Sequence, residues 1–281
     1  MNRTYRSALP RARTGRKNAR SMRGPRPAGA AQPHRLIAGK RLAERAAQKA
    51  AVPAAPTPAA AAAAAPVARK RTTRMAETHS IDPEHLRGRH ISRAVEVLRA
   101  GGVVIYPTDT IYGLGCDITR KDGIERVRRI KGRDARKPMS FVCADLNDVS
   151  RYAHVSNFAY RILRRFLPGP YTFVLPATKE TPRILQTRQK TVGLRVPDHP
   201  VPLALVRALG HPIISTSANR SQEEVLTDLR ELEATLGRQV DLIMECGLLS
   251  GVASSVISLI DDQVEILREG QGDLSYFREQ L

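Results

Sequence analysis

Apolar residues recur along residues 90–281 in two alternating patterns. Apolar positions three and four residues apart indicate helices at 90–102, 122–130, 156–166, 201–210 and 225–237. Short runs rich in Val, Ile and Leu lie between them and predict strands at 103–106, 139–144, 171–177, 191–196, 211–217, 240–246, 254–260 and 264–269. This alternation predicts one α/β domain on a mixed sheet that is parallel in part. Because the last three strands have short connections, we expect them to pair antiparallel.

Residues 1–74 have a different composition. They contain 18 Lys and Arg residues and one acid, Glu44, and therefore carry +17 of the net charge of +19. They show no apolar periodicity and end in the Ala- and Pro-rich stretch 53–66. A segment of this kind buries too little apolar surface to offset its conformational entropy. We therefore expect residues 1–80 to be a disordered basic tail.

Three interpretations of the tail stay open. In the first, translation begins at Met75 and the tail is not made. In the second, the tail is a basic arm that contacts nucleic acid without sequence preference. In the third, it is an Arg-rich transit peptide of an organelle. The rest of the chain carries 28 Lys and Arg residues against 26 Asp and Glu residues, so its charge alone indicates no nucleic-acid binding.

The cysteines and the apolar runs indicate the compartment. Cys116, Cys143 and Cys246 are odd in number and far apart, and no pair has the spacing of metal ligands. We expect buried, reduced thiols in a cytoplasmic protein. No run of 18 apolar residues and no signal-peptide core occurs, so the sequence predicts neither export nor a membrane span.

Polar and basic side chains follow or flank several of the predicted strands. Arg and Lys supply positive charge and donors, and Ser and Thr hydroxyls bind phosphate or carboxylate oxygens, so these side chains suggest an anionic ligand. They are Thr108, Asp109, Thr110, Tyr112, Lys131, Arg133, Thr172, Arg195, Ser217, Asn219 and Arg268. Each also has a structural interpretation, as a capped turn, a solvated basic loop, a helix N-cap or a surface ion pair. Spacing alone leaves both interpretations open.

Several motifs of covalent and nucleotide chemistry are missing from the sequence. GxxxxGK[ST] and GxSxG do not occur, and the short GLG at 113–115 is not a dinucleotide-binding motif. The histidines at 154, 199 and 211 have no evident Ser or Cys partner. We therefore expect catalysis by positioning and electrostatics and not through a covalent intermediate.

A series of motifs resembles one known family. In chain order they are PTDTIYGLG, KGR followed by KP, PGPYTFVL, VGLRVPDHP, STSAN, SSVISL and ILREG. Together they resemble the YrdC family of threonylcarbamoyl-AMP synthases over residues 85–277, in its short, single-domain form. Residues 157–186 and the ending LREGQGD are most similar to the YciO branch. The resemblance implies a twisted mixed sheet with flanking helices and a concave ligand cleft.

The resemblance also implies a reaction. L-threonine takes up bicarbonate, and the resulting carbamate attacks the α-phosphate of ATP, so the enzyme is a nucleotidyltransferase that releases pyrophosphate. Mg²⁺ would arrive on ATP, without metal ligands from the protein. The product, threonylcarbamoyl-AMP, would serve a transferase complex that forms N6-threonylcarbamoyladenosine in tRNA. No enzyme nucleophile is needed, which agrees with the missing motifs.

Roles for the candidate residues follow from the same resemblance. Lys131 and Arg133 would be the catalytic cations, and we expect Lys131 to be exposed. Gly113 and Gly115 would let the backbone approach the ligand. The side chains for L-threonine and bicarbonate would be Thr108, Thr110, Tyr112 and Ser217. Those for ATP would be Lys131, Arg133, Thr172, Arg195, Asn219 and Arg268.

An alternative function belongs to a different class. In it the chain is a YciO-like protein without this catalysis, or with another specificity, that binds RNA or the ribosome through the same concave surface. The family is also associated with double-stranded RNA. A carbamoyl-transfer domain of the hydrogenase-maturation type is less favoured, because that system carries zinc-finger and acylphosphatase modules, which this sequence lacks.

Overall fold

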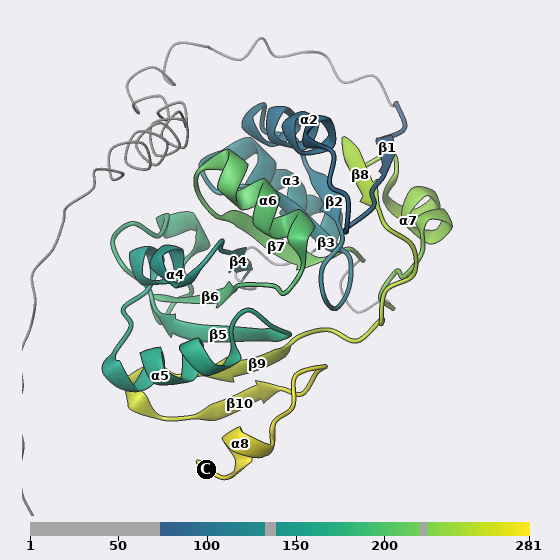
Figure 1. Cartoon of the computed structure of the whole chain (residues 1–281). Helices are drawn as coiled ribbons and strands as arrows, with labels where there is room; N and C mark the ends of the chain where they lie inside the picture. Colours follow the sequence, from purple (N-terminus) through teal and green to yellow (C-terminus); the bar gives the residue numbers. More distant parts are fainter. Residues whose placement is uncertain (1–73, 133–138, 220–223) are drawn as a thin grey trace, which may run out of the picture. The chain divides into compact units, whose positions relative to one another are not determined.

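Ten strands form one mixed sheet in the computed structural model, which describes residues 74–132, 139–219 and 224–281. In chain order they are β1 (Glu77–Ser80), β2 (Val104–Tyr106), β3 (Gly113–Asp117), β4 (Ser140–Val142), β5 (Tyr171–Pro176), β6 (Thr191–Arg195), β7 (Ile213–Ser217), β8 (Leu242–Glu245), β9 (Ser255–Ser258) and β10 (Glu265–Arg268). They lie in the order β1-β8-β2-β3-β7-β4-β6-β5-β9-β10 (Figure 1). The pairs β1–β8, β2–β8, β4–β6 and β5–β9 are parallel and the others antiparallel, which confirms the predicted mixed sheet.

The helices largely follow the predicted periodicity. They are α2 (Gly88–Arg99), α3 (Lys121–Lys131), α4 (Leu146–Tyr152), α5 (Asn157–Phe166), α6 (Pro200–Leu209), α7 (Leu229–Leu236) and α8 (Ser275–Arg278). The side chains of Ser156 and Asp228 accept backbone N–H bonds at the starts of α5 and α7, and Gly210, with φ 88°, ends α6. Within the ranges described, every helix is too short or too polar to cross a bilayer.

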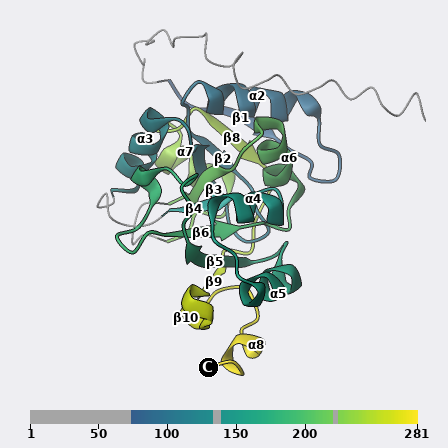
Figure 2. The ribbon, with the colours of Figure 1, turned by 90° about the vertical axis from the view of Figure 1, so that its left-hand side faces the viewer.

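The two faces of the sheet are covered differently. On one face α3, α4, α5, α7 and α8 enclose a large core that reaches from β2 to β10. On the other face α2 and α6 pack together over residues of β2, β4, β7 and β8 and form a second core. The twist of the sheet carries α4 and α5 to the side of the picture opposite α3 and α7, although all four pack on the same face (Figure 2).

The antiparallel pairing expected for the last three strands is correct for β9 and β10 and wrong for β8. β8 lies between β1 and β2 and is parallel to both, whereas β9 is parallel to β5 near the other end of the sheet. Residues 246–254 connect β8 to β9 across the sheet without forming a hairpin. An interior position buries Leu242, Ile243 and Met244 completely, and this burial outweighs the preference for a local hairpin.

Two strands were not predicted. Residues 77–80, assigned above to the tail, form the edge strand β1, so the expected boundary at residue 80 is wrong. The rest of the tail, residues 1–73, lies outside the described residues. β1 is polar and half-exposed, and its sequence has no apolar pattern. β3 contains Gly113 and Gly115, which are typical of loops, so its sequence does not predict a strand. All its residues are nevertheless buried.

The cysteines are unpaired, as the sequence predicts. Cys116 and Cys143 are buried as expected, but the expectation is wrong for Cys246, which is partly exposed in the connection to β9. Burial raises the pKa of the Cys116 and Cys143 thiols above the ordinary range. Both therefore behave as apolar core residues and not as nucleophiles.

Candidate functional site

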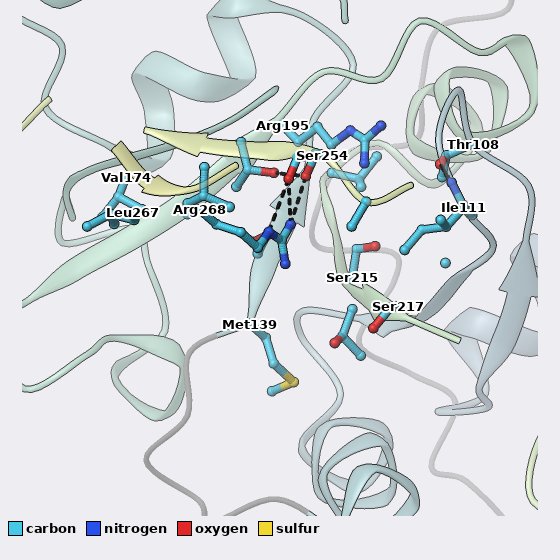
Figure 3. A pocket seen from close by; sticks show the side chains of 18 of the residues that line it. Thr108, Ile111, Met139, Val174, Arg195, Ser215, Ser217, Ser254, Leu267 and Arg268 are labelled. Atoms are coloured by element: carbon cyan, nitrogen blue, oxygen red, sulfur yellow. Dashed lines mark hydrogen bonds between the residues drawn. The ribbon is translucent and has the colours of Figure 1, made fainter. Parts of the chain in front are cut away.

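A cavity of about 390 Å³ lies on the half of the sheet that α2 and α6 leave open (Figure 3). Because side chains of a strand point to opposite faces in turn, alternate residues of neighbouring strands supply most of the strand lining, to which Thr216 of β7 is added. They are Ser140 and Val142 of β4, Thr172 and Val174 of β5, Thr191, Gly193 and Arg195 of β6, and Ser215 and Ser217 of β7. The residues between them, such as Phe141, Phe173 and Leu194, belong to the core on the other face.

A bulge in β10 brings Arg268 to this cavity. Ile266 is opposite Ile257 and Arg268 is opposite Val256, so one extra residue, Leu267, lies between two consecutive partners. Leu267 and Arg268 consequently both line the cavity. Without the bulge, strict alternation would turn one of these two side chains to the other face.

Arg268 is held by the residue that precedes β9. Its Nε and Nη2 atoms donate to the carbonyl oxygen of Ser254 at 3.1 and 2.7 Å, and Nη2 lies 3.2 Å from Ser254 Oγ (Figure 3). Ser254 Oγ is 2.9 Å from Thr172 Oγ1. All three residues line the cavity. The predicted ATP residues Thr172 and Arg268 are thus joined through Ser254, which sequence reasoning missed.

Arg195 forms a second cationic group, which is almost buried. Its Nη2 atom donates to Asp109 Oδ1 at 2.6 Å and to Thr110 Oγ1 at 2.9 Å. Burial lowers the pKa of the Arg195 guanidinium, and the charge and hydrogen bond of Asp109 oppose this effect. Asp109 and Thr110 belong to the connection between β2 and β3, so the ion pair joins this connection to β6.

Thr108 both caps the turn and lines the cavity. Its Oγ1 accepts the N–H groups of Thr110 and Ile111 at 3.1 and 3.2 Å and donates to the Ile111 carbonyl at 2.6 Å. The structural interpretation of this turn as a capped turn is thereby confirmed, and ligand binding by Thr108 stays a prediction. Tyr112 also contributes to the lining, but its hydroxyl donates to the Gly247 carbonyl at 2.7 Å and accepts the Cys246 N–H at 3.1 Å.

The expectation that Lys131 is exposed is wrong. Its side chain turns inward at the end of α3, and the residue is 1% exposed. Nζ donates to the Ser217 carbonyl at 2.8 Å and to Asn219 Oδ1 at 2.6 Å, lies 3.3 Å from Ser217 Oγ, and contacts the Asn219 carbonyl. Buried carbonyl oxygens need donors, and the ammonium group supplies them to the turn after β7. Lys131 therefore lies behind Ser217, which lines the cavity.

The structure brings most of the predicted residues to one place. Thr108, Tyr112, Thr172, Arg195, Ser217 and Arg268 line the cavity. Three others are outside its lining but contact residues in it: Thr110 bonds Arg195, and Lys131 and Asn219 bond Ser217. Arg133 lies outside the described residues, so its predicted role stays a prediction.

Both glycines of β3 lie against the Tyr106 ring. A Cβ at Gly113, which lines the cavity, would lie 2.8 Å from Tyr106 Cζ. A Cβ at Gly115 would lie 2.8 Å from Tyr106 Cε1 and 2.7 Å from the Ile214 carbonyl oxygen. Both glycines therefore make room for Tyr106, whose hydroxyl donates to Ser215 Oγ at 2.7 Å below the cavity floor. The close approach of a ligand to this backbone stays a prediction.

The composition of the cavity limits its chemistry. Among the described lining residues there is no carboxylate, histidine or cysteine, whereas two guanidinium groups and several hydroxyls are present. The described residues also contain no cluster of three or more metal-ligating side chains. The arrangement can bind an anionic ligand and stabilise negative charge, and its apolar members Met139, Val174, Val256 and Leu267 can cover a less polar part of that ligand.

The chain belongs to the Sua5/YciO/YrdC family, whose family model, described as telomere recombination, matches residues 96–270. It is 42% identical to the uncharacterized protein YciO of Escherichia coli K12 over 205 residues, 72% of this chain and all of that protein. It is 37% identical to the threonylcarbamoyl-AMP synthase of Nitrosococcus oceani over 152 residues, 54% of this chain and 82% of that protein. The predicted family is thereby confirmed.

Solved structures show the same fold. The crystal structure of E. coli YciO matches with a TM-score of 0.69 and 41% identity, and the match covers 72% of this chain and all of that chain. The structure of P. abyssi Sua5 complexed with L-threonine matches with a TM-score of 0.68 and 29% identity, over 73% of this chain and 60% of that chain. The predicted fold class is confirmed by both.

Proposed function

We propose that the chain is an L-threonylcarbamoyladenylate synthase, which makes threonylcarbamoyl-AMP from L-threonine, bicarbonate and ATP. One observation carries this proposal: a cavity of about 390 Å³ presents Arg195 and Arg268 from separate strands among hydroxyl groups, with no carboxylate, histidine or cysteine among its described lining residues. Reactants that are all anionic or zwitterionic need such an environment. The relative named threonylcarbamoyl-AMP synthase and the Sua5 structure with L-threonine support the same activity.

The proposed reaction has two steps. The amine of L-threonine combines with bicarbonate to give a carbamate and water. A carbamate oxygen then attacks the α-phosphorus of ATP, and the bond to pyrophosphate breaks. The protein need only bring two anions together and stabilise the charge that shifts to pyrophosphate.

The proposed roles come from the family resemblance, and the positions of the residues are compatible with them. Thr108 and Ser217 bind the L-threonine and bicarbonate end, and Thr172, Arg195 and Arg268 bind ATP. Lys131 increases the positive potential behind Ser217 and Asn219, and Thr110 and Tyr112 hold the surrounding backbone and side chains. Lys131 and Arg133 remain the two proposed catalytic cations.

The site is compatible with Mg²⁺ that is bound to the phosphates of ATP. Because no carboxylate lines the described part of the cavity, the hard oxygen ligands that Mg²⁺ prefers would come from the phosphates. When bound, the ion neutralises phosphate charge. Arg195 and Arg268 bind and orient the remaining phosphate oxygens.

The product requires a consumer. A threonylcarbamoyl adenylate is a mixed anhydride, which transfers its acyl group readily to an amine. We propose that a cytoplasmic tRNA-modifying transferase accepts it. A contact with RNA is consistent with this role.

The second candidate function is a YciO-like protein that binds RNA or the ribosome without this turnover. The observation that favours it is the 42% identity to E. coli YciO, which covers that protein completely. Both candidates use the same cavity face, so they differ in chemistry and not in fold.

Pyrophosphate release separates the two candidates. The full chain is incubated with ATP, Mg²⁺ and bicarbonate, with and without L-threonine, and the adenylate is identified by mass spectrometry. We expect release that requires both L-threonine and bicarbonate and that is lost in Arg268→Gln. ATP left intact under all conditions, together with RNA binding by the same sample, would replace the synthase with the second candidate.

A further inference from the structure

Asp109 lies between Thr108 and Thr110, which both have a role in the proposed function. Asp109 itself has no role in that proposal. Its Oδ1 atom accepts a 2.6 Å hydrogen bond from Arg195 Nη2, and the side chains of Arg195 and Asp109 are 10% and 11% exposed. Arg195 lines the cavity and Asp109 does not. The carboxylate therefore contacts the cation and not the cavity.

The backbone around Asp109 is fixed from a distant part of the chain. Gln271 Nε2 donates to the Asp109 carbonyl at 3.0 Å, and Ser250 Oγ donates to the Thr110 carbonyl at 2.7 Å. Ser250 Oγ and Gln271 Oε1 are 2.6 Å apart. These contacts hold the β2–β3 connection in place, so Asp109 has a defined position from which to orient Arg195.

The ion pair uses one edge of the guanidinium group. Nη2 is shared between Asp109 Oδ1 and Thr110 Oγ1. In the described part of the chain, Asp109 Oδ2 and Arg195 Nε are buried without a hydrogen-bond partner, and no hydrogen bond involves Nη1. Arg–carboxylate pairs are frequently bidentate, with two nitrogens of the guanidinium group bonded to the two oxygens. In this pair only the Nη2 nitrogen of Arg195 bonds to the described part of the protein.

We propose that Asp109 is a positioning residue for Arg195: with Thr110 it fixes the guanidinium group so that the group faces an anionic ligand in the cavity. The consequence for turnover rests on the proposed function. The orientation of Arg195 does not depend on that function. Preorganised donors avoid reorganisation when charge develops, so a small displacement of Arg195 weakens catalysis without removing any ligand contact of Asp109 itself.

The first measurement tests positioning without any substrate. The ¹⁵N relaxation of the Arg195 Nε–H group, assigned by its loss in Arg195→Gln, reports how rigid the side chain is. We expect a rigid group in the full native chain and a mobile one in Asp109→Asn, with the melting temperature measured alongside. A group equally rigid in both proteins would overturn the proposal, whatever the protein catalyses.

The second measurement tests the consequence for turnover. We expect Asp109→Asn to lower kcat/KM by about tenfold to a hundredfold, the usual effect of a misplaced substrate-orienting group. In the Arg195→Gln background the same substitution should have no further effect, because it acts through Arg195. An equal loss in both backgrounds would show that Asp109 acts otherwise and would refute the positioning role.

Matched variants separate positioning from general loss of stability. Asp241→Asn removes another Asp–Arg pair away from the cavity, that of the partly exposed Asp241 with the nearly buried Arg126. It should lower the melting temperature but leave KM and the Arg195 signal unchanged. Thr110→Val should resemble Asp109→Asn in part, because it removes the second acceptor of Arg195 Nη2. If no variant and not even the native chain turns over, the proposed function fails and the relaxation result still decides the role of Asp109.

Discussion

Lys131 lies in the last turn of α3 with Arg128 and Arg129, yet it is the only one of the three that is buried. The sequence identifies a basic loop but does not say which cation meets the turn after β7. That depends on how α3 is rotated against the sheet, which is a property of the whole core. The positions of Thr172, Arg195 and Ser217 could be predicted, because each lies in or at the end of a strand. The ion pair of Asp109 and the contacts of Ser254 could not, since their partners are remote in sequence.

The burial of Lys131 predicts a cost in stability. Lys131→Met should lower the free energy of unfolding by about 2–4 kcal/mol, because the carbonyls of Ser217 and Asn219 and the amide oxygen of Asn219 lose a charged donor. Lys121→Ala on the exposed part of the same helix should change it by less than about 0.5 kcal/mol. Urea unfolding measures both. Equal stability of Lys131→Met and the native chain would mean that the buried contacts contribute nothing.

At the scale of elements, regular apolar periodicity predicts the helices and most of the strands. It does not identify a strand that contains glycines. The five predicted helices and all eight predicted strands exist, although several of their boundaries shift. β3 was hidden because Gly113 and Gly115 resemble a loop, and β1 because an exposed edge strand needs no apolar pattern. The sequence does not predict the bulge in β10 either. Its extra residue is visible only from the register against β9, and it is what turns Arg268 toward the cavity.

The close packing of β3 against Tyr106 predicts the effect of a single methyl group. Gly115→Ala would place a Cβ 2.7 Å from the Ile214 carbonyl, which is backbone and cannot move aside. We expect a loss of about 1–3 kcal/mol in the free energy of unfolding. Gly88→Ala is the matched control: no atom lies within 4 Å of its Cβ position, so it should be neutral or slightly stabilising. Two variants of equal stability would contradict the packing described for β3.

At the scale of the whole molecule, the site results from incomplete coverage of the sheet. α2 and α6 cover one half of a face, and the strands of the other half present alternate side chains to the cavity. The sequence predicts that strands and helices alternate, but not which end of the sheet lacks helices. That depends on the β8–β9 connection, which returns the chain to the far end and places Ser254 and Arg268 opposite Ser217 across the cavity.

The edge of the sheet makes the stability of the molecule depend on pH. β1 is attached to α2 by the Nδ1 atoms of His79 and His90, which lie 3.0 Å apart, and by Arg93 bound to Glu77. Burial lowers the pKa of His90 below its ordinary value of 6.5, and the positive charges of His79, Arg89 and Arg87 lower it further. The folded protein therefore keeps His90 neutral where the unfolded chain already takes up a proton.

The sign of the effect follows directly. The contribution of His90 is fully present above pH 6.5 and is lost as the pH falls through 6.5 toward the lowered value of the folded state. The native chain should therefore lose more unfolding free energy between pH 7.5 and 5.5 than His90→Gln, which cannot titrate. His85→Gln, at an exposed histidine paired with Asp82, should lose as much as the native chain. Urea unfolding at the two pH values checks this, with hydrogen exchange of residues 77–80 to locate the change. If His90→Gln loses as much as the native chain, the histidine pair is not the origin of the pH dependence.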